Sequence, residues 1–217
     1  MNRLLNALLN LLYPPKCPFC GKVLDQGEDG LCFACQRILP WVGEDEVRTV
    51  EFCDGCLSPL WYRDGARDGV HRYKFQNGRA HARLFGDLMA QCLQDRWEEP
   101  VDLITWVPLS KKRLRERGYD QARLLAQRMG EVTGLPVAAA LAKTRNTRTQ
   151  SRLGQDASRR ANVLGAYACR PEVELAGKRV ALVDDVVTSG ATLAECAACL
   201  RAAGAASVVV LTLARAK

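Results

Sequence analysis

The most informative part of this chain is Arg179-Val-Ala-Leu-Val-Asp-Asp-Val-Val-Thr-Ser-Gly-Ala-Thr192. Its apolar run, Val180 to Val183, has the composition of a buried strand. A loop of small residues, Thr188 to Thr192, follows, and from Leu193 onward apolar side chains recur at helical spacing. A strand, a small-residue loop and a helix N-terminus together form an anion site, because free backbone N–H groups and the helix dipole point into the loop.

Two adjacent carboxylates, Asp184 and Asp185, lie between this strand and this loop. Two negative charges would weaken a site for phosphate alone. They suit a ligand that carries hydroxyl groups, or a metal ion bound to hydroxyls, beside its phosphate. A ribose 5-phosphate has that layout, with a phosphate at one end and a vicinal diol at the other. We therefore expect the carboxylates to take the diol and the loop to take the phosphate through Thr188, Ser189, Gly190, Ala191 and Thr192.

The part of this run from Val183 to Thr192 resembles the signature with which type I phosphoribosyltransferases bind phosphoribosyl pyrophosphate (PRPP). The resemblance implies an α/β fold with a mostly parallel sheet flanked by helices. The rest of the chain agrees, because segments of strand character alternate with segments of helical periodicity. We expect a helix over 80–97, a second helix that ends at Gly134, a long polar loop over 143–162, and strands over 101–107, 137–141, 163–168, 179–183 and 207–213.

The N-terminal part of the chain carries cysteine pairs with the spacing of metal ligands. Cys17 and Cys20 form one C-x-x-C pair, and Cys32 and Cys35 form another. Two such pairs complete the tetrahedral shell of a structural zinc ion. Gly21 follows the first pair and suits a turn that needs a positive φ. Disulfide bonds are the alternative, and they are rare in the cytoplasm, where we expect this chain to be.

The remaining cysteines are less informative. Cys53 and Cys56 form a third pair with no fourth pair to complete a second site. Three interpretations stay open: a vestigial second zinc site, a free pair, or a pair that replaces one of the first two. Cys196 and Cys199 share the spacing but lie in an Ala-rich helical run, where buried cysteine behaves as a small hydrophobe.

Composition and patterning limit the organisation of the chain. Its 217 residues, 48% of them hydrophobic, suit one medium domain with a small appendage. We expect a metal-stapled module over 1–60 and a phosphoribosyltransferase-like domain over 61–217. The net charge of +7 favours anionic partners. No apolar run is long enough to span a bilayer, and the leucine-rich segment 2–13 has the pattern of a short amphipathic helix rather than a signal peptide.

The order of the motifs is more specific than the signature alone. The two Cys pairs are followed by Val107-Pro-Leu, by Arg117-Gly-Tyr-Asp-Gln-Ala122, and by Thr144-Arg-Asn-Thr-Arg-Thr-Gln-Ser-Arg-Leu153 with Arg160-Ala-Asn162. The signature then closes the series. Over nearly the whole chain this order resembles the ComF family, also called ComFC or GntX-like. The resemblance implies a role in competence and DNA uptake, with PRPP as the ligand and with single-stranded DNA and other competence proteins as candidate partners.

The resemblance also implies roles for single residues. Asp184 and Asp185 would be the catalytic carboxylates, which face the ribose hydroxyls directly or through Mg²⁺. The loop after Pro108 would bind pyrophosphate through the cations Lys111, Arg113 and Arg117. The segment 144–162 would close over the site, and its ligand-facing residues would be Arg148, Gln150 and Arg152.

The implied chemistry is that of a glycosyltransferase. Pyrophosphate would leave C1 of PRPP through an oxocarbenium-like state, and the protein would position the groups and stabilise the departing charge. Two alternatives stay open: a transferase of nucleotide or related metabolism, and a PRPP sensor without catalysis. The Cys module and the Arg117-Gly-Tyr-Asp-Gln pattern argue against an ordinary salvage enzyme.

Overall fold

The computed structural model describes residues 14–43, 48–76, 78–145 and 163–217. Its centre is a five-stranded sheet in the order β1-β7-β6-β3, and β2 also pairs with β7. Every pairing in this sheet is parallel, which confirms the predicted α/β class. The strands are β1 (Gly55–Leu57), β2 (Leu60–Trp61), β3 (Leu103–Trp106), β6 (Arg179–Val187) and β7 (Ser207–Arg215).

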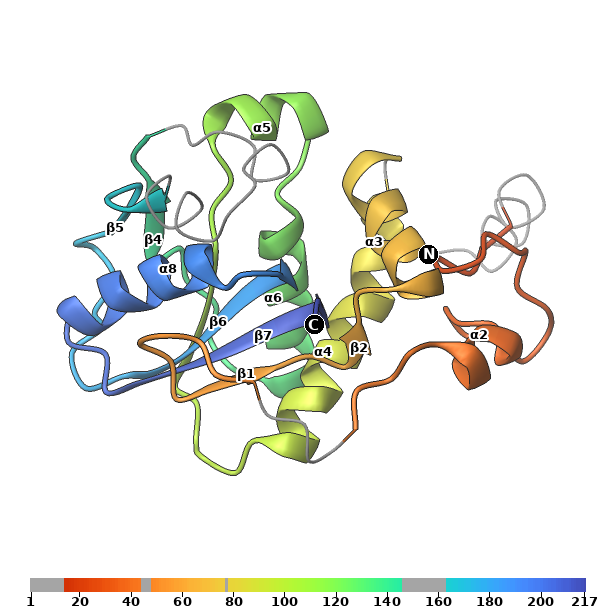
Figure 1. Cartoon of the computed structure of the whole chain (residues 1–217), viewed down its shortest axis with the longest axis horizontal. Coiled ribbons are helices and arrows are strands. Elements are labelled where there is room, and N and C mark those ends of the chain that lie inside the picture. Colours follow the sequence, from red (N-terminus) through yellow and green to blue (C-terminus); the bar gives the residue numbers. More distant parts are fainter. Residues whose placement is uncertain (1–13, 44–47, 77, 146–162) are drawn as a thin grey trace.

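Helices cover both faces of the sheet (Figure 1). Successive residues of a strand point to opposite faces. In β6, Ala181 and Val183 therefore pack in the cluster that contains α3 (Asp64–Phe75), α4 (Ala82–Arg96) and α6 (Gln121–Thr133). Val180 and Leu182 pack in a second cluster with α8 (Ala191–Ala202). Both faces of β6 are buried, which is why its sequence is a continuous apolar run.

The segment around the long polar loop differs from expectation. A strand was expected over 137–141, but Val137 makes only an isolated bridge with Ile104. The strand β4 covers Leu141–Lys143 instead, and it pairs antiparallel with β5 (Tyr167–Cys169), outside the main sheet. Before β4, the N–H of Ala140 donates to the side-chain hydroxyl of Thr105 in β3 and to the carbonyl of Ala138, at 3.2 and 3.0 Å. Residues 137–140 thus form an irregular connection, of which Ala140 is buried and the rest half-buried.

Within the expected module 1–60, β1 and the first residue of β2 belong to the main sheet. Residues 14–43, which we call the N-terminal module from here on, pack on α3 at one side of the main domain (Figure 1). The module contains the short helix α2 (Phe33–Ile38). Phe19 is buried against α3, and a Cβ at Gly69 would lie 2.6 Å from its ring. From the same helix, Arg72 donates through Nη1 to the carbonyl oxygens of Pro18 and Phe19, at 3.1 and 2.6 Å. Among the described residues, no helix has the length and apolar character to cross a membrane.

Candidate functional site

The signature run forms the end of β6 and the start of α8. Strand β6 extends past the expected 179–183 to Val187, so both aspartates lie within it. Asp184 accepts a hydrogen bond from the backbone N–H of Asp185 through Oδ1, at 2.8 Å. The strand ends in the loop, and Gly190 precedes α8 with a φ of +79°, a conformation that favours glycine.

Both aspartates line a cavity of about 200 Å³. Of the remaining residues that the sequence predicted as ligands, four also line it: Arg113, Arg117, Thr188 and Thr192. Ser189 and Gly190 lie in the turn between the two threonines, and Ala191 begins α8. The structure therefore brings the carboxylates, the ends of the phosphate loop and two of the proposed cations to one cavity at the carboxyl end of β6, as expected for a parallel sheet.

The basic segment after Pro108 was expected as a loop, but it contains the helix α5 (Lys111–Arg117). Ser110 caps its N-terminus, since its hydroxyl accepts from the N–H of Arg113 at 3.3 Å. Gly118 ends the helix with a φ of +75°. This helix places Arg113 and Arg117 at the cavity, whereas Lys111 is exposed and does not line it.

Asp120 shows what the Arg117-Gly-Tyr-Asp motif does structurally. Its Oδ1 accepts from the N–H of Arg123, which caps α6, and its Oδ2 accepts from the N–H of Leu109, at 3.3 and 3.2 Å. The one carboxylate thus ties the loop after Pro108 to the helix behind it. Burial raises the pKa of Asp120, and the nearby charge of Asp185 raises it further.

Two lysines that the sequence did not indicate also line the cavity. Lys74, in α3, places its Nζ 2.7 Å from Oδ1 of Asp185. Lys143, the last residue of β4, donates from Nζ to the hydroxyl of Tyr167 at 2.9 Å. Burial lowers the pKa of Lys143 to about 8, and the charge of Arg113 contributes. Neither lysine belongs to a motif, and only tertiary packing brings them to the aspartates.

The carboxylate pair is a suitable donor set for magnesium, because Mg²⁺ prefers carboxylate and other hard oxygen ligands. Burial raises the pKa of Asp184 to about 8, and the charge of Asp185 adds to this, while Lys74 opposes it. A bound cation favours the ionised carboxylate. One oxygen of Asp185 is already paired with Lys74, which leaves Asp184 as the carboxylate with the greater need for a cation.

Behind the phosphate loop lies Arg48, which the sequence also did not indicate. Its guanidinium donates to the carbonyl oxygen of Thr188 and, at 2.6 Å, to that of Ala216. Val50 packs beside Gly190, whose Cβ would lie 3.4 Å from it. The connection between the N-terminal module and β1 therefore supports the phosphate loop from outside the cavity.

The first two cysteine pairs come together as predicted. The sulfur atoms of Cys17, Cys20, Cys32 and Cys35 all lie within 4.8 Å of one another. The turn after the first pair has Gly21 at a φ of +79°, and its N–H donates to the carbonyl of Cys17 at 2.8 Å. Burial alone would raise the pKa of Cys17, but backbone hydrogen bonds bring it to about 7. Four converging thiols are the donor set of a structural zinc site.

The third pair lies apart from this cluster. Cys56 is buried in β1 beside Val210 of β7, and burial raises its pKa to about 11. Burial likewise raises the pKa of Cys53 to about 12. Since the four-thiol cluster is complete without them, the interpretation that this pair replaces one of the first two is wrong.

The described residues at the two ends of the expected closing segment 144–162 adjoin the cavity. Lys143 and Tyr167, which line the cavity, lie in the two strands on either side of this segment. At its base the N–H of Thr144 donates to the carbonyl of Ala166 at 2.9 Å. The predicted ligand residues Arg148, Gln150 and Arg152 lie outside the described residues.

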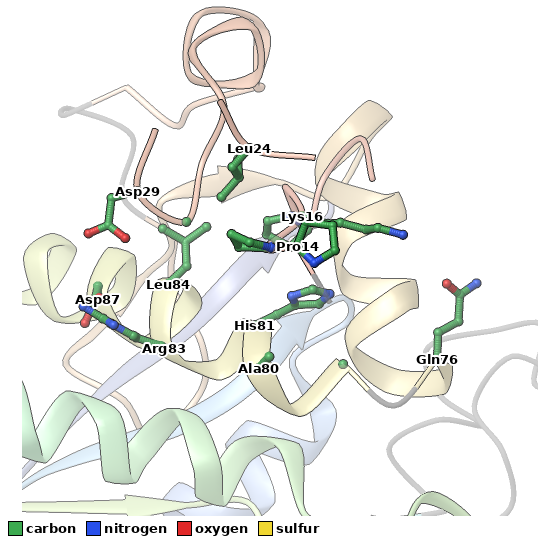
Figure 2. Close-up of a pocket in the computed structure, with 14 residues that line it drawn as sticks. Pro14, Lys16, Leu24, Asp29, Gln76, Ala80, His81, Arg83, Leu84 and Asp87 are labelled. Carbon is green, nitrogen blue, oxygen red and sulfur yellow. The ribbon is translucent and has the colours of Figure 1, made fainter. Parts of the chain in front are cut away.

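A larger cavity, of about 720 Å³, lies between the N-terminal module and the turn from α3 to α4 (Figure 2). Its walls mix apolar side chains such as Leu24 and Leu84 with charged ones such as Lys16 and Asp29. Burial lowers the pKa of His81 in its wall. Its described lining residues differ entirely from those of the smaller cavity. The chemistry of paired carboxylates and cations belongs to the smaller one.

Comparison with known proteins gives two domain matches and several relatives along the whole chain. A phosphoribosyl transferase domain family matches residues 74–217, and a double zinc ribbon domain family matches residues 8–66. Competence protein F of Haemophilus influenzae is 32% identical over 93% of this chain and 97% of its own length. The DNA utilization protein YhgH of Escherichia coli K12 is 30% identical over 94% and 99%. Competence protein ComFC of Bacillus subtilis is 26% identical over 92% and 77%.

Proposed function

Since the chain belongs to the phosphoribosyl transferase domain family and is similar along its length to competence protein F and YhgH, we propose that it is a PRPP-binding protein of DNA uptake or DNA processing. One observation carries the proposal: the twin carboxylates, the phosphate loop and several cations converge on one cavity. The proposed location is the cytoplasm, where its free thiols would stay reduced.

The geometry supports one orientation of the ligand. The 5-phosphate would take the loop from Thr188 to Thr192 at the start of α8. The ribose hydroxyls would donate to Asp184 and Asp185. The pyrophosphate group would then lie toward the cations of the opposite wall, which are Arg113, Arg117 and Lys143.

If the protein is a transferase, these residues position PRPP and stabilise the negative charge of the departing pyrophosphate. The acceptor forms a bond to C1, the C1–O bond to pyrophosphate breaks, and its electron pair leaves with the pyrophosphate. Arg113 and Arg117 would stabilise that departing charge. Bound Mg²⁺ would supply further compensation of the phosphate charge.

We expect calorimetric titration with PRPP and Mg²⁺ to show saturable binding, because the cavity offers partners for each part of the ligand. Ribose without phosphate should bind far more weakly and serves as the control. The release of pyrophosphate with a candidate acceptor would mark an enzyme, and binding without release would mark a sensor. Absence of heat with PRPP at millimolar concentration would overturn the proposal.

A second function, binding of single-stranded DNA, is favoured by the surface of α5. None of its residues is buried, and its sequence, Lys-Lys-Arg-Leu-Arg-Glu-Arg, carries five cations. Beside it, the ring of Phe75 is 60% exposed and lies 5.0 Å from the guanidinium of Arg117. Cations interleaved with an exposed aromatic ring suit the backbone and the bases of a single strand. In Figure 1, α5 lies at the outer edge of the molecule.

We expect the affinity for single-stranded DNA to fall as salt rises, with a slope of about −0.7 per phosphate contact on logarithmic axes. Lys112→Glu on α5 should weaken binding and flatten that slope, as fluorescence anisotropy with an oligonucleotide would show. Lys178→Glu makes the same charge change at an exposed lysine just before β6. This position is at the end of β6 that is away from the cavity, so the variant should have little effect. Equal effects of the two variants, or no binding at low salt, would count against an α5 interface.

A further inference from the structure

One carboxylate of the Asp184–Asp185 pair forms an ion pair with a lysine of the protein itself. Nζ of Lys74 lies 2.7 Å from Oδ1 of Asp185, and the two side chains are only 19% and 12% exposed. Lys74 comes from α3, far in sequence from the signature and outside its motif. The ion pair is therefore a feature of the cavity rather than of the exposed surface, and solvent screens it weakly.

The charges that face this pair make a counter-ion necessary. Asp184 and Asp185 place two carboxylates side by side, and the nearby carboxylate of Asp120 adds a third acidic group. The cations Arg113, Arg117 and Lys143 line the same cavity, but Lys74 is the one that forms an ion pair with the aspartates among the described residues. Asp185 thus has its charge compensated before any ligand or metal arrives.

The lysine is held in place by rigid neighbours. Tyr73, the preceding residue, is fully buried and donates from its hydroxyl to the carbonyl of Gln121 at 2.8 Å. The hydroxyl of Tyr119 donates in turn to the carbonyl of Tyr73. These hydrogen bonds fix the last turn of α3 against α6, so Lys74 is presented to Asp185 from a well-anchored backbone.

We propose that Lys74 is a positioning residue that acts as the built-in counter-cation of the diol site, so that the chain binds ribose 5-phosphates without a divalent metal. The ammonium group neutralises Asp185 and orients its free oxygen toward the ribose hydroxyls. Mg²⁺ is then required for the pyrophosphate group of PRPP rather than for recognition of the sugar. This inference rests on the proposed function and specifies the ligand class of the same site.

The test is calorimetric titration with ribose 5-phosphate, in magnesium-free buffer and in Mg²⁺. The magnesium-free buffer is passed over a chelating resin before the protein is added and contains no soluble chelator, so that zinc stays on the four-thiol cluster. The wild-type chain binds ribose 5-phosphate in the magnesium-free buffer. Lys74→Met loses about tenfold or more of that affinity, because a charge-assisted contact in a mostly buried site is removed, and regains most of it in Mg²⁺. Lys74→Arg keeps the charge and stays close to wild type. Lys178→Met, which removes an exposed lysine away from the cavity, serves as the matched control.

A second neutral variant keeps the test decisive if Lys74→Met does not fold, as judged by its thermal melt. Lys74→Gln retains a hydrogen-bond donor without the charge, and the same loss in magnesium-free buffer is expected. Wild-type affinity of the folded neutral variants in magnesium-free buffer would overturn the inference, and so would a wild-type chain that binds PRPP with Mg²⁺ but no ribose 5-phosphate in magnesium-free buffer. In both cases the proposed function stands. A wild-type chain that binds neither compound with Mg²⁺ would overturn both.

Discussion

The double variant Asp184→Asn, Asp185→Asn is expected to lose about 100-fold or more of its affinity for PRPP in Mg²⁺. Each hydrogen bond to a charged group contributes about 1.5 to 3 kcal/mol, and two such acceptors are replaced. Asparagine keeps the size of the side chain, and its amide oxygen still accepts a hydrogen bond. The fold should therefore persist. Calorimetry measures the affinity, and a thermal melt measures the fold.

Asp102 provides a matched control, because it pairs with the first residue of β6, at the end of the strand away from the aspartates. Asp102 accepts hydrogen bonds from the guanidinium of Arg179, at the start of β6, at 2.9 and 2.6 Å. These bonds hold the pKa of Asp102 well below its usual range. Asp102→Asn removes a paired carboxylate of the same kind away from the cavity, so PRPP affinity should be unchanged. Wild-type affinity in the double variant would refute the assignment of the diol site to Asp184 and Asp185.

The elements that the sequence predicted correctly are those with a strong local pattern. β6 is a continuous apolar run because it is buried on both faces, and α8 follows a loop whose Gly190 adopts a positive φ. The sequence of α5 also has capping residues, a Ser before the helix and a Gly after it. The segment was nevertheless predicted as a loop, because its many charged residues leave no hydrophobic periodicity. In that segment, capping residues were a better guide than hydrophobic periodicity.

The helix α3 shows why other elements were missed. Its buried residues Ala66, Val70 and Tyr73 recur at helical spacing, but polar residues and Gly69 separate them, and another glycine precedes Ala66. Glycine is unfavourable inside a helix. At Gly69 it is needed because the ring of Phe19 packs where a Cβ would lie. The packing partner comes from the zinc module, and no local pattern contains that information.

The residues of the candidate site also fall into two groups, those with a local sequence pattern and those brought in by tertiary packing. The aspartates and the loop 188–192 are contiguous in sequence, so residue order alone could predict that they lie at one cavity. Lys74, Lys143 and Arg48 come from three other segments and reach the site only through the packing of α3, the β4–β5 pair and the connection before β1. Nothing in the sequence marks these residues as part of the site, because a single lysine or arginine is common in a basic chain.

Loss of the metal is expected to unfold the N-terminal module while the sheet remains folded. Cys32→Ser removes one of four converging ligands, and zinc bound to such sites provides about 10 to 16 kcal/mol of folding free energy in small domains. The described part of the module places few side chains of its own in the core, among them Phe19 and Leu39. Elemental analysis should show loss of zinc, and limited proteolysis should show new cleavage among residues 14–40.

Cys53→Ser is the matched control, because Cys53 lies outside the four-thiol cluster. It should keep its zinc and its resistance to proteases, and loss of zinc from this variant would show that the third pair takes part in metal binding. The module also packs on the helix that carries Lys74, through Phe19 and through the hydrogen bonds of Arg72. Unfolding it should therefore lower the metal-free affinity for ribose 5-phosphate as well, whereas a chain without zinc that binds this ligand normally would show that α3 holds its position unaided.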